Sequence, residues 1–176
     1  MEDWHKIFWG GGVGKQMPEI ADWVRQKQLH HSKVLDFGCG KGGTMQWLQT
    51  IYPNIHMQGW DIGTEQYRKR PRDIQFDGIY SIDCWEHIEE SELLDAWANL
   101  DRISHADTLH CHIIDLTPAK KRLPDGRNAH VTLWSVAKWL AWFGTHSTIQ
   151  HHAVIEEPDK RFGLRQRLCV HLEMNR

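Results

Sequence analysis

The sequence predicts an α/β fold, a Rossmann-like three-layer sandwich whose sheet is mostly parallel and ends in an antiparallel C-terminal strand. Three observations predict it. Short apolar runs alternate with segments of helical periodicity along the chain of 176 residues. A glycine-rich turn, VLDFGCGKGG, contains the end of the first apolar run. Two strand-like runs close the chain and are joined by a turn over residues 158–163.

Each expected element has a local justification. Ile20, Trp23 and Val24 follow helical spacing after Pro18, which favours a helix start. Ser91 is a suitable N-cap for a helix with a buried stripe of leucine and tryptophan. Strands are expected at residues 33–37, 55–60, 78–82, 108–116, 148–155 and 164–172, and helices at 18–29, 44–51, 91–103 and 134–143.

Composition and length indicate one globular domain. The 40% hydrophobic and 25% charged content is ordinary for such a domain, and a net charge of -2 gives no global attraction to nucleic acid or anionic membranes. We expect a single domain over residues 18–176, preceded by a flexible N-terminal lid over residues 1–17. Trp4, Phe8 and Trp9 are able to close over a ligand there, although a plainly disordered terminus explains the same composition equally well.

The cysteines and the N-terminus indicate a cytoplasmic protein. The four cysteines are widely spaced and form no C-x-x-C pair, which is typical of free thiols in a reducing compartment. The first residues do not read as a signal peptide, and no apolar run approaches the roughly 20 residues that cross a bilayer.

The glycine turn fits two nucleotide-binding patterns. Gly38, Gly40 and Gly43 match G-x-G-x-x-G, whereas Asp36 followed by Gly38, Gly40 and Gly42 matches the pattern that holds S-adenosylmethionine. A carboxylate at Asp36 would repel a dinucleotide's pyrophosphate and would attract a sulfonium or ammonium group. We therefore favour S-adenosylmethionine, although a turn-capping role for Asp36 is an alternative. A second acid, Asp61, ends the next strand, where it can accept both hydroxyls of a ribose.

Four segments resemble the class I S-adenosylmethionine-dependent methyltransferases. VLDFGCGKGGT is similar to their first motif, GWDIG to their second, FDGIYSIDCWEHI to the fourth-strand motif and HVTLWSVAKWLAWFG to the stretch after the fifth strand. The resemblance implies S-adenosylmethionine as cofactor, with ribose on Asp61 and adenine against Ile62. The other cofactor-binding residues that it implies are Asp36, Phe37, Gly38, Cys39, Gly40, Ser81, Ile82 and Asp83.

One departure from that family is visible. Residues 62–75 are too few for the usual helix, third strand and second helix, so we expect the third strand to be reduced or missing. The adenine pocket is then abbreviated, or it is completed by another part of the chain or by a partner subunit such as a second copy in a homodimer.

Catalytic candidates follow the later strands, at the edge where such sheets bind ligands. His87 and His130 have a suitable ordinary pKa for a general base, and Trp85, Asp115, Arg127 and Asn128 are candidate substrate-binding residues. Alternatively, His87 only caps the following helix, and the loop that contains Arg127 is only solvated. His110 and His112 share a strand face but have no evident third ligand, so no metal site is expected.

The sequence thus predicts an S-adenosylmethionine-dependent methyltransferase that acts on an oxygen or nitrogen of a small polar acceptor. A non-catalytic or partner-dependent S-adenosylmethionine-binding subunit is the main alternative, and an NAD-dependent oxidoreductase is a weaker one. Duplex DNA and membranes are not expected partners, because the chain lacks the [DNS]-P-P-[YFW] and Pro-Cys motifs of DNA-modifying relatives and is nearly neutral.

Overall fold

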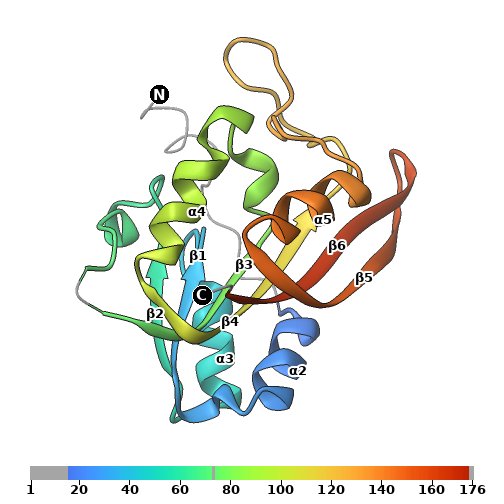
Figure 1. The fold of residues 1–176 in the computed structure, drawn as a ribbon. Helices are drawn as coiled ribbons and strands as arrows, with labels where there is room; N and C mark the ends of the chain where they lie inside the picture. The colour runs from blue at the N-terminus through green and yellow to red at the C-terminus, as the bar shows by residue number, and fades with distance from the viewer. Residues whose placement is uncertain (1–15, 73, 175–176) are drawn as a thin grey trace.

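The computed structural model describes residues 16–72 and 74–174 and contains one six-stranded sheet (Figure 1). The strand order is β2-β1-β3-β4-β6-β5, with β1 to β4 parallel, β6 antiparallel to β4, and β5 antiparallel to β6. The predicted mixed sheet is therefore confirmed. The strands are β1 (Lys33–Phe37), β2 (His56–Trp60), β3 (Phe76–Ile82), β4 (Ser104–Asp115), β5 (Ser147–Asp159) and β6 (Gly163–Met174).

Helices cover both faces of the sheet and make three layers (Figure 1). One core contains Trp23 and Leu48, from α2 and α3, packed on the strands, and the opposite core contains Trp97 and Trp139, from α4 and α5. The helices are α2 (Pro18–Gln26), α3 (Gly43–Ile51), α4 (Leu93–Asp101) and α5 (Val136–Gly144), with short 3-10 turns η1 (Leu29–His31), η2 (Glu65–Tyr67), η3 (Trp85–His87) and η4 (Glu90–Glu92). None of the helices in the described part of the chain is long and apolar enough to cross a membrane.

The third strand is missing, as expected, since β2 forms an edge of the sheet and only η2 lies among the described residues between β2 and β3. The proposed lid over residues 1–17 lies almost wholly outside the described residues, so its role stays a prediction. Strand β4 begins at Ser104, four residues before the predicted start at residue 108. A register shift between Phe76 and Gly78 accommodates that start, and the Thr108 hydroxyl donates to the Phe76 carbonyl.

A chain of buried hydrogen bonds crosses the face of β3 and β4 under α4 and α5. Ser81 Oγ lies 2.9 Å from His112 Nδ1, His112 Nε2 lies 3.3 Å from His110 Nδ1, and His110 Nε2 lies 3.4 Å from Ser104 Oγ. The Ser104 hydroxyl donates to the Leu100 carbonyl, so it accepts a hydrogen bond from His110. All hydrogen bonds of this series then run in the same direction. Each imidazole donates one and accepts one, and both imidazoles are therefore neutral. Burial lowers the pKa of His110 to about 3 and that of His112 well below its ordinary value.

These buried histidines should make the fold sensitive to acid. The unfolded chain takes up protons below a pKa of about 6.5 while the folded chain does not, so stability falls as the pH drops through that value. Replacing His112→Leu should reduce the stability lost between pH 7 and pH 5 by about 2 kcal/mol. Urea unfolding at both pH values measures this, with exposed His152→Ala as the control. An equal loss in wild type and His112→Leu would contradict the neutral assignment.

Candidate functional site

The glycine turn leaves an open face at the carboxyl end of β1. Gly38, Gly40 and Gly42 all have positive φ, from 54° to 78°, which side chains disfavour. A Cβ on Gly38 would lie 2.4 Å from Cys84 Sγ, so the glycine turn and the loop after β3 are in direct contact. A Cβ on Gly40, by contrast, would meet no atom within 4 Å. Gly40 therefore presents bare backbone to open space, as a turn that holds a ligand requires.

Asp61 is fixed beside this turn. One carboxylate oxygen accepts the Gly40 amide and the other accepts the Gly63 amide, both at 2.9 Å. Each carboxylate oxygen has a second lone-pair direction, so ribose hydroxyls can still be accepted. The adjacent Ile62 is 58% exposed and offers an apolar surface beside Asp61.

Asp36 is a buried carboxyl group at the end of β1. Its Oδ2 accepts the Tyr80 hydroxyl at 2.8 Å, and only 3% of the residue is exposed. Burial raises the pKa of Asp36 to about 7, the Tyr80 hydrogen bond acts against this rise, and the negative charge of Asp61 adds to it. A cation nearby would restore the carboxylate, so the group is poised to respond to a positively charged ligand.

Tyr67, in the short segment between β2 and β3, lies beside the glycine turn. Its carbonyl accepts the Asp61 amide at 2.9 Å, its hydroxyl oxygen would lie 2.6 Å from a Cβ on Gly42, and its ring would lie 3.0 Å from a Cβ on Gly59. Burial raises the pKa of the Tyr67 hydroxyl, to which Cys39 and Asp36 also contribute. Tyr67 was not predicted, because nothing in the sequence of residues 62–75 signals a return to the glycine turn.

The five remaining predicted cofactor residues have different surroundings. Phe37 packs in the core against Trp60 and Trp85, and the buried Ser81 hydroxyl belongs to the histidine chain. Cys39 is half-buried at the turn, with its Sγ 3.7 Å from the Gly40 carbonyl. Ile82, half-buried, precedes Asp83, whose φ of 48° is left-handed.

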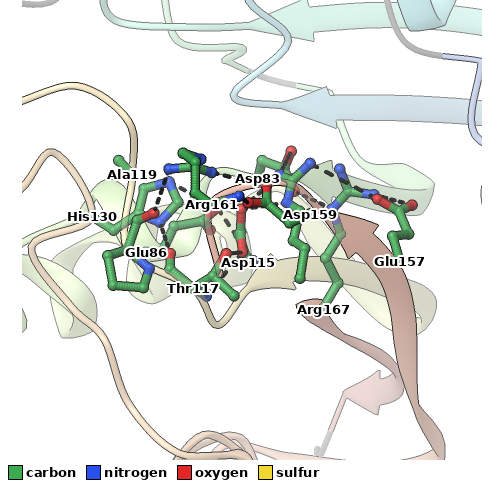
Figure 2. A network of polar contacts seen from close by, with 12 residues as sticks. Asp83, Glu86, Asp115, Thr117, Ala119, His130, Glu157, Asp159, Arg161 and Arg167 are labelled. Atoms are coloured by element: carbon green, nitrogen blue, oxygen red, sulfur yellow. Dashed lines mark hydrogen bonds and ion pairs between the residues drawn. The ribbon is translucent and has the colours of Figure 1, made fainter. Parts of the chain in front are cut away.

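Ion pairs tie the carboxyl ends of β3 and β4 to β6 (Figure 2). The Arg165 guanidinium lies 3.0 Å from Asp83 and 2.6 Å from Asp115. Arg167 Nε lies 3.1 Å from Asp83, and its Nη1 donates to Glu157 at 2.8 Å. Asp115, a predicted substrate residue, is thus held in an ion pair with Arg165, and neither Arg165 nor Arg167 was predicted.

A cavity of about 310 Å³ opens next to these ion pairs. It lies between the ends of β3 and β4, the loop before α5 and the β5–β6 turn, and it brings together His87 and His130. Its other lining residues are Asp83, Asp115, Pro118, Ala119, Lys120, Lys121, Ala129, Asp159, Arg161 and Arg165.

The two predicted bases meet in this cavity. Their rings lie 4.7 Å apart between centroids, nearly perpendicular to each other. His130 Nδ1 contacts the Thr117 carbonyl and His87 Nδ1 the Ala129 carbonyl, so each imidazole carries its proton on Nδ1 and can accept one on Nε2. Burial lowers the pKa of His130, which keeps it neutral at pH 7.

Glu86 lies behind His130 and is completely buried (Figure 2). Its Oε1 is 4.0 Å from His130 Nε2 and accepts the Asp115 amide. Burial, reinforced by Asp83, raises the pKa of Glu86 well above its ordinary value. Glu86, His87 and His130 each offer a ligand atom within 4.8 Å of the others and could hold a metal ion. His110 and His112, in contrast, bond to one another.

The remaining predicted substrate residues do not line the cavity. Trp85 is fully buried among the aromatic rings of the core. Arg127 is exposed and pairs with Asp125 and Glu89. Asn128 bonds to the backbone of Ala119, which shapes the loop.

An open glycine turn and a ribose-type acid on a Rossmann-like sheet define a nucleoside-binding α/β protein. The model of a family described as "Methyltransferase domain" matches residues 13–175, and the chain belongs to this family. The resemblance to class I S-adenosylmethionine-dependent methyltransferases is therefore confirmed. A curated relative, an uncharacterized protein of Rickettsia prowazekii, is 25% identical over 80 residues, which cover 46% of this chain and 14% of that protein.

Solved structures show the same fold. TehB from Haemophilus influenzae matches with a TM-score of 0.65 and 11% identity, over 90% of this chain and 62% of TehB. Coclaurine N-methyltransferase bound to N-methylheliamine and S-adenosylhomocysteine matches with a TM-score of 0.66 and 12% identity, over 97% and 77%. The 1,6-didemethyltoxoflavin-N1-methyltransferase of Burkholderia thailandensis, also with S-adenosylhomocysteine, gives 0.64 and 13%, over 92% and 80%.

The residues at the glycine turn fit S-adenosylmethionine, the cofactor that the family implies. Gly40 leaves open space, Asp61 is a fixed acceptor, Ile62 offers an apolar surface, and Asp36 supplies negative charge for a cationic ligand.

Filling the open space above Gly40 should block the cofactor. Gly40→Ala should weaken S-adenosylhomocysteine binding at least about tenfold, because the added methyl group occupies that space. Gly126→Ala is a matched control, since Gly126 also has positive φ and open surroundings but lies outside the glycine turn. Calorimetry with both variants tests this, and equal weakening would show that backbone strain alone is responsible.

The Asp36 carboxyl should lower the stability of the folded chain and strengthen the binding of S-adenosylmethionine. The folded chain holds this proton up to about pH 7 while the unfolded chain loses it near pH 4, so the group costs stability as the pH rises through that window. Asp36→Asn should therefore be more stable than wild type at pH 8, by up to about 4 kcal/mol, and no more stable at pH 4. It should also bind S-adenosylmethionine more weakly. Urea unfolding and calorimetry measure the two effects, and unchanged affinity would contradict a role for this carboxylate.

Proposed function

We propose that this domain transfers a methyl group from S-adenosylmethionine to an oxygen or nitrogen of a small polar acceptor bound beside His87 and His130. One observation carries the proposal: the glycine turn and the histidine-lined cavity adjoin at the same edge of the sheet. The contact between Gly38 and Cys84 joins the two loops that form them.

The size and charge of the cavity support a small polar acceptor. Its volume of about 310 Å³ is at the lower end of the range for small-molecule sites. Lys120 and Lys121 supply cationic groups, whereas Arg161 is paired with Asp159, and Asp83 and Asp115 are paired with Arg165. Two structural neighbours are named as N-methyltransferases, and each was solved with a small molecule bound.

The chain's own residues would act by position and by removal of a proton. When bound, S-adenosylmethionine supplies a methyl carbon activated by positive sulfur. His130 Nε2 can accept the proton that an acceptor hydroxyl or amine must lose, because the Thr117 carbonyl holds the other nitrogen protonated. Burial of Glu86 disfavours a negative charge beside this imidazole, which favours His130 as an uncharged base. His87, edge-on to His130, completes one wall.

Labelled methyl transfer tests the proposal. The full chain, incubated with methyl-labelled S-adenosylmethionine and a metabolite extract, should label a small molecule at oxygen or nitrogen. Label on carbon or sulfur, or none on small molecules, would overturn this acceptor assignment. Tighter binding of NAD than of S-adenosylhomocysteine would overturn the cofactor assignment independently.

The base role of His130 has its own test. His130→Asn should lower kcat by about 10²–10⁴-fold without changing the affinity for S-adenosylhomocysteine. Wild-type kcat should rise with pH as His130 loses its proton below its ordinary pKa, and the variant should lack this rise. His152→Asn, on exposed β5, is the matched control. A variant that keeps full kcat would exclude His130 as the base.

A further inference from the structure

A second cluster of reactive side chains lies on the opposite face of the sheet. Cys111 on β4 and Cys169 on β6 belong to the core that α2 covers, and His171 on β6 pairs in register with Cys111. Cys111 lies four residues before Asp115 on β4, about 13 Å along the strand, so the cluster is separate from the proposed methyl-transfer site.

The three side chains have the geometry of metal ligands. Cys111 Sγ, Cys169 Sγ and a His171 nitrogen all lie within 4.8 Å of one another. Cys169 Sγ is 3.7 Å from His171 Nε2. A sulfur and a nitrogen bound to one tetrahedral zinc ion, at the usual bond lengths, are about 3.6 Å apart. One edge of the tetrahedron is therefore already in place.

The cluster is reachable from solvent and has an acidic neighbour. A cavity of about 540 Å³ between α2 and the β5–β6 hairpin is lined by Cys169, His171 and Glu19, among others. One carboxylate oxygen of Glu19 is buried and has no hydrogen-bond partner among the described residues. An unpaired buried oxygen costs free energy, and a nearby cation would offset that cost.

We propose that Cys111, Cys169 and His171 form a binding site for a thiophilic divalent cation, with zinc as the best match. Two sulfurs and one imidazole suit zinc better than magnesium or calcium, which prefer oxygen ligands. The fourth position opens to the cavity, where Glu19 lies. A bound ion would join the central strand β4 to β6 and would stabilise the C-terminal hairpin.

Metal titration of the full, reduced chain tests the site. In a His130→Asn background, which removes a ligand of the Glu86, His87 and His130 cluster that could also hold a metal ion, one zinc ion per chain should bind after treatment with a chelator, as counted by native mass spectrometry. Cobalt should give a thiolate-to-metal charge-transfer band. Zinc at 100 times its Kd should raise Tm by roughly 5–10 °C. Cys169→Ser and His171→Asn should each weaken zinc binding at least about 100-fold.

Matched variants distinguish the site from incidental thiol binding. Cys39→Ser and Cys84→Ser remove the other two cysteines and should leave zinc stoichiometry unchanged. His151→Asn removes an exposed imidazole next to His171 and should also retain the ion. Circular dichroism verifies that each variant is folded. Because His171 is only half-buried, His171→Asn should perturb the core less than the cysteine substitution does.

Three outcomes would overturn the proposal. They are no stoichiometric zinc binding, binding that survives loss of both Cys169 and His171, and a disulfide between Cys111 and Cys169 in the freshly purified chain. None of them depends on methyl transfer, so failure here and failure of the proposed function are distinguishable.

Discussion

The ion pairs between two arginines of β6 and the acids that end β3 and β4 determine the shape of the functional edge. Arg165 and Arg167 of β6 form ion pairs with Asp83, which follows β3 and is distant from β6 in the sequence. Asp83, which both arginines contact, has a left-handed backbone conformation, and Asp83, Asp115 and Arg165 all line the cavity. Such buried pairs add little net stability, but loss of one partner would leave an uncompensated charge. They act here by specifying geometry.

Much of the fold could be predicted because its signals are local. The glycine turn, the helix periodicities and the short segment after Asp61 are each contained in a few consecutive residues, and each led to the observed element. The same holds for Asp61 and for the open backbone at Gly40, since glycine spacing and strand ends are visible in the sequence. The two histidines were also expected at this edge, because both follow parallel strands.

What could not be predicted depends on register between distant segments. Arg165 reaches Asp83 only because β6 pairs antiparallel with β4, and no local pattern sets that alignment. Tyr67 returns to the glycine turn through an irregular segment for the same reason. Trp85 illustrates the reverse case. Its place after β3 indicated substrate contact, yet neighbouring rings from α4 and α5 enclose it completely.

The distribution of indole rings makes one layer of the sandwich optically distinct. Trp85, Trp97, Trp139 and Trp142 form a connected cluster on the α4–α5 side, with neighbouring ring centroids 5.5–6.2 Å apart. The α2–α3 side has Trp23 and the half-buried Trp47. Indole rings this close exchange excitation energy. The rings of His112 and His146 pack against Trp85 and Trp142, respectively. Most of the tryptophan ultraviolet absorbance of the described residues therefore belongs to the layer that packs beneath α4 and α5.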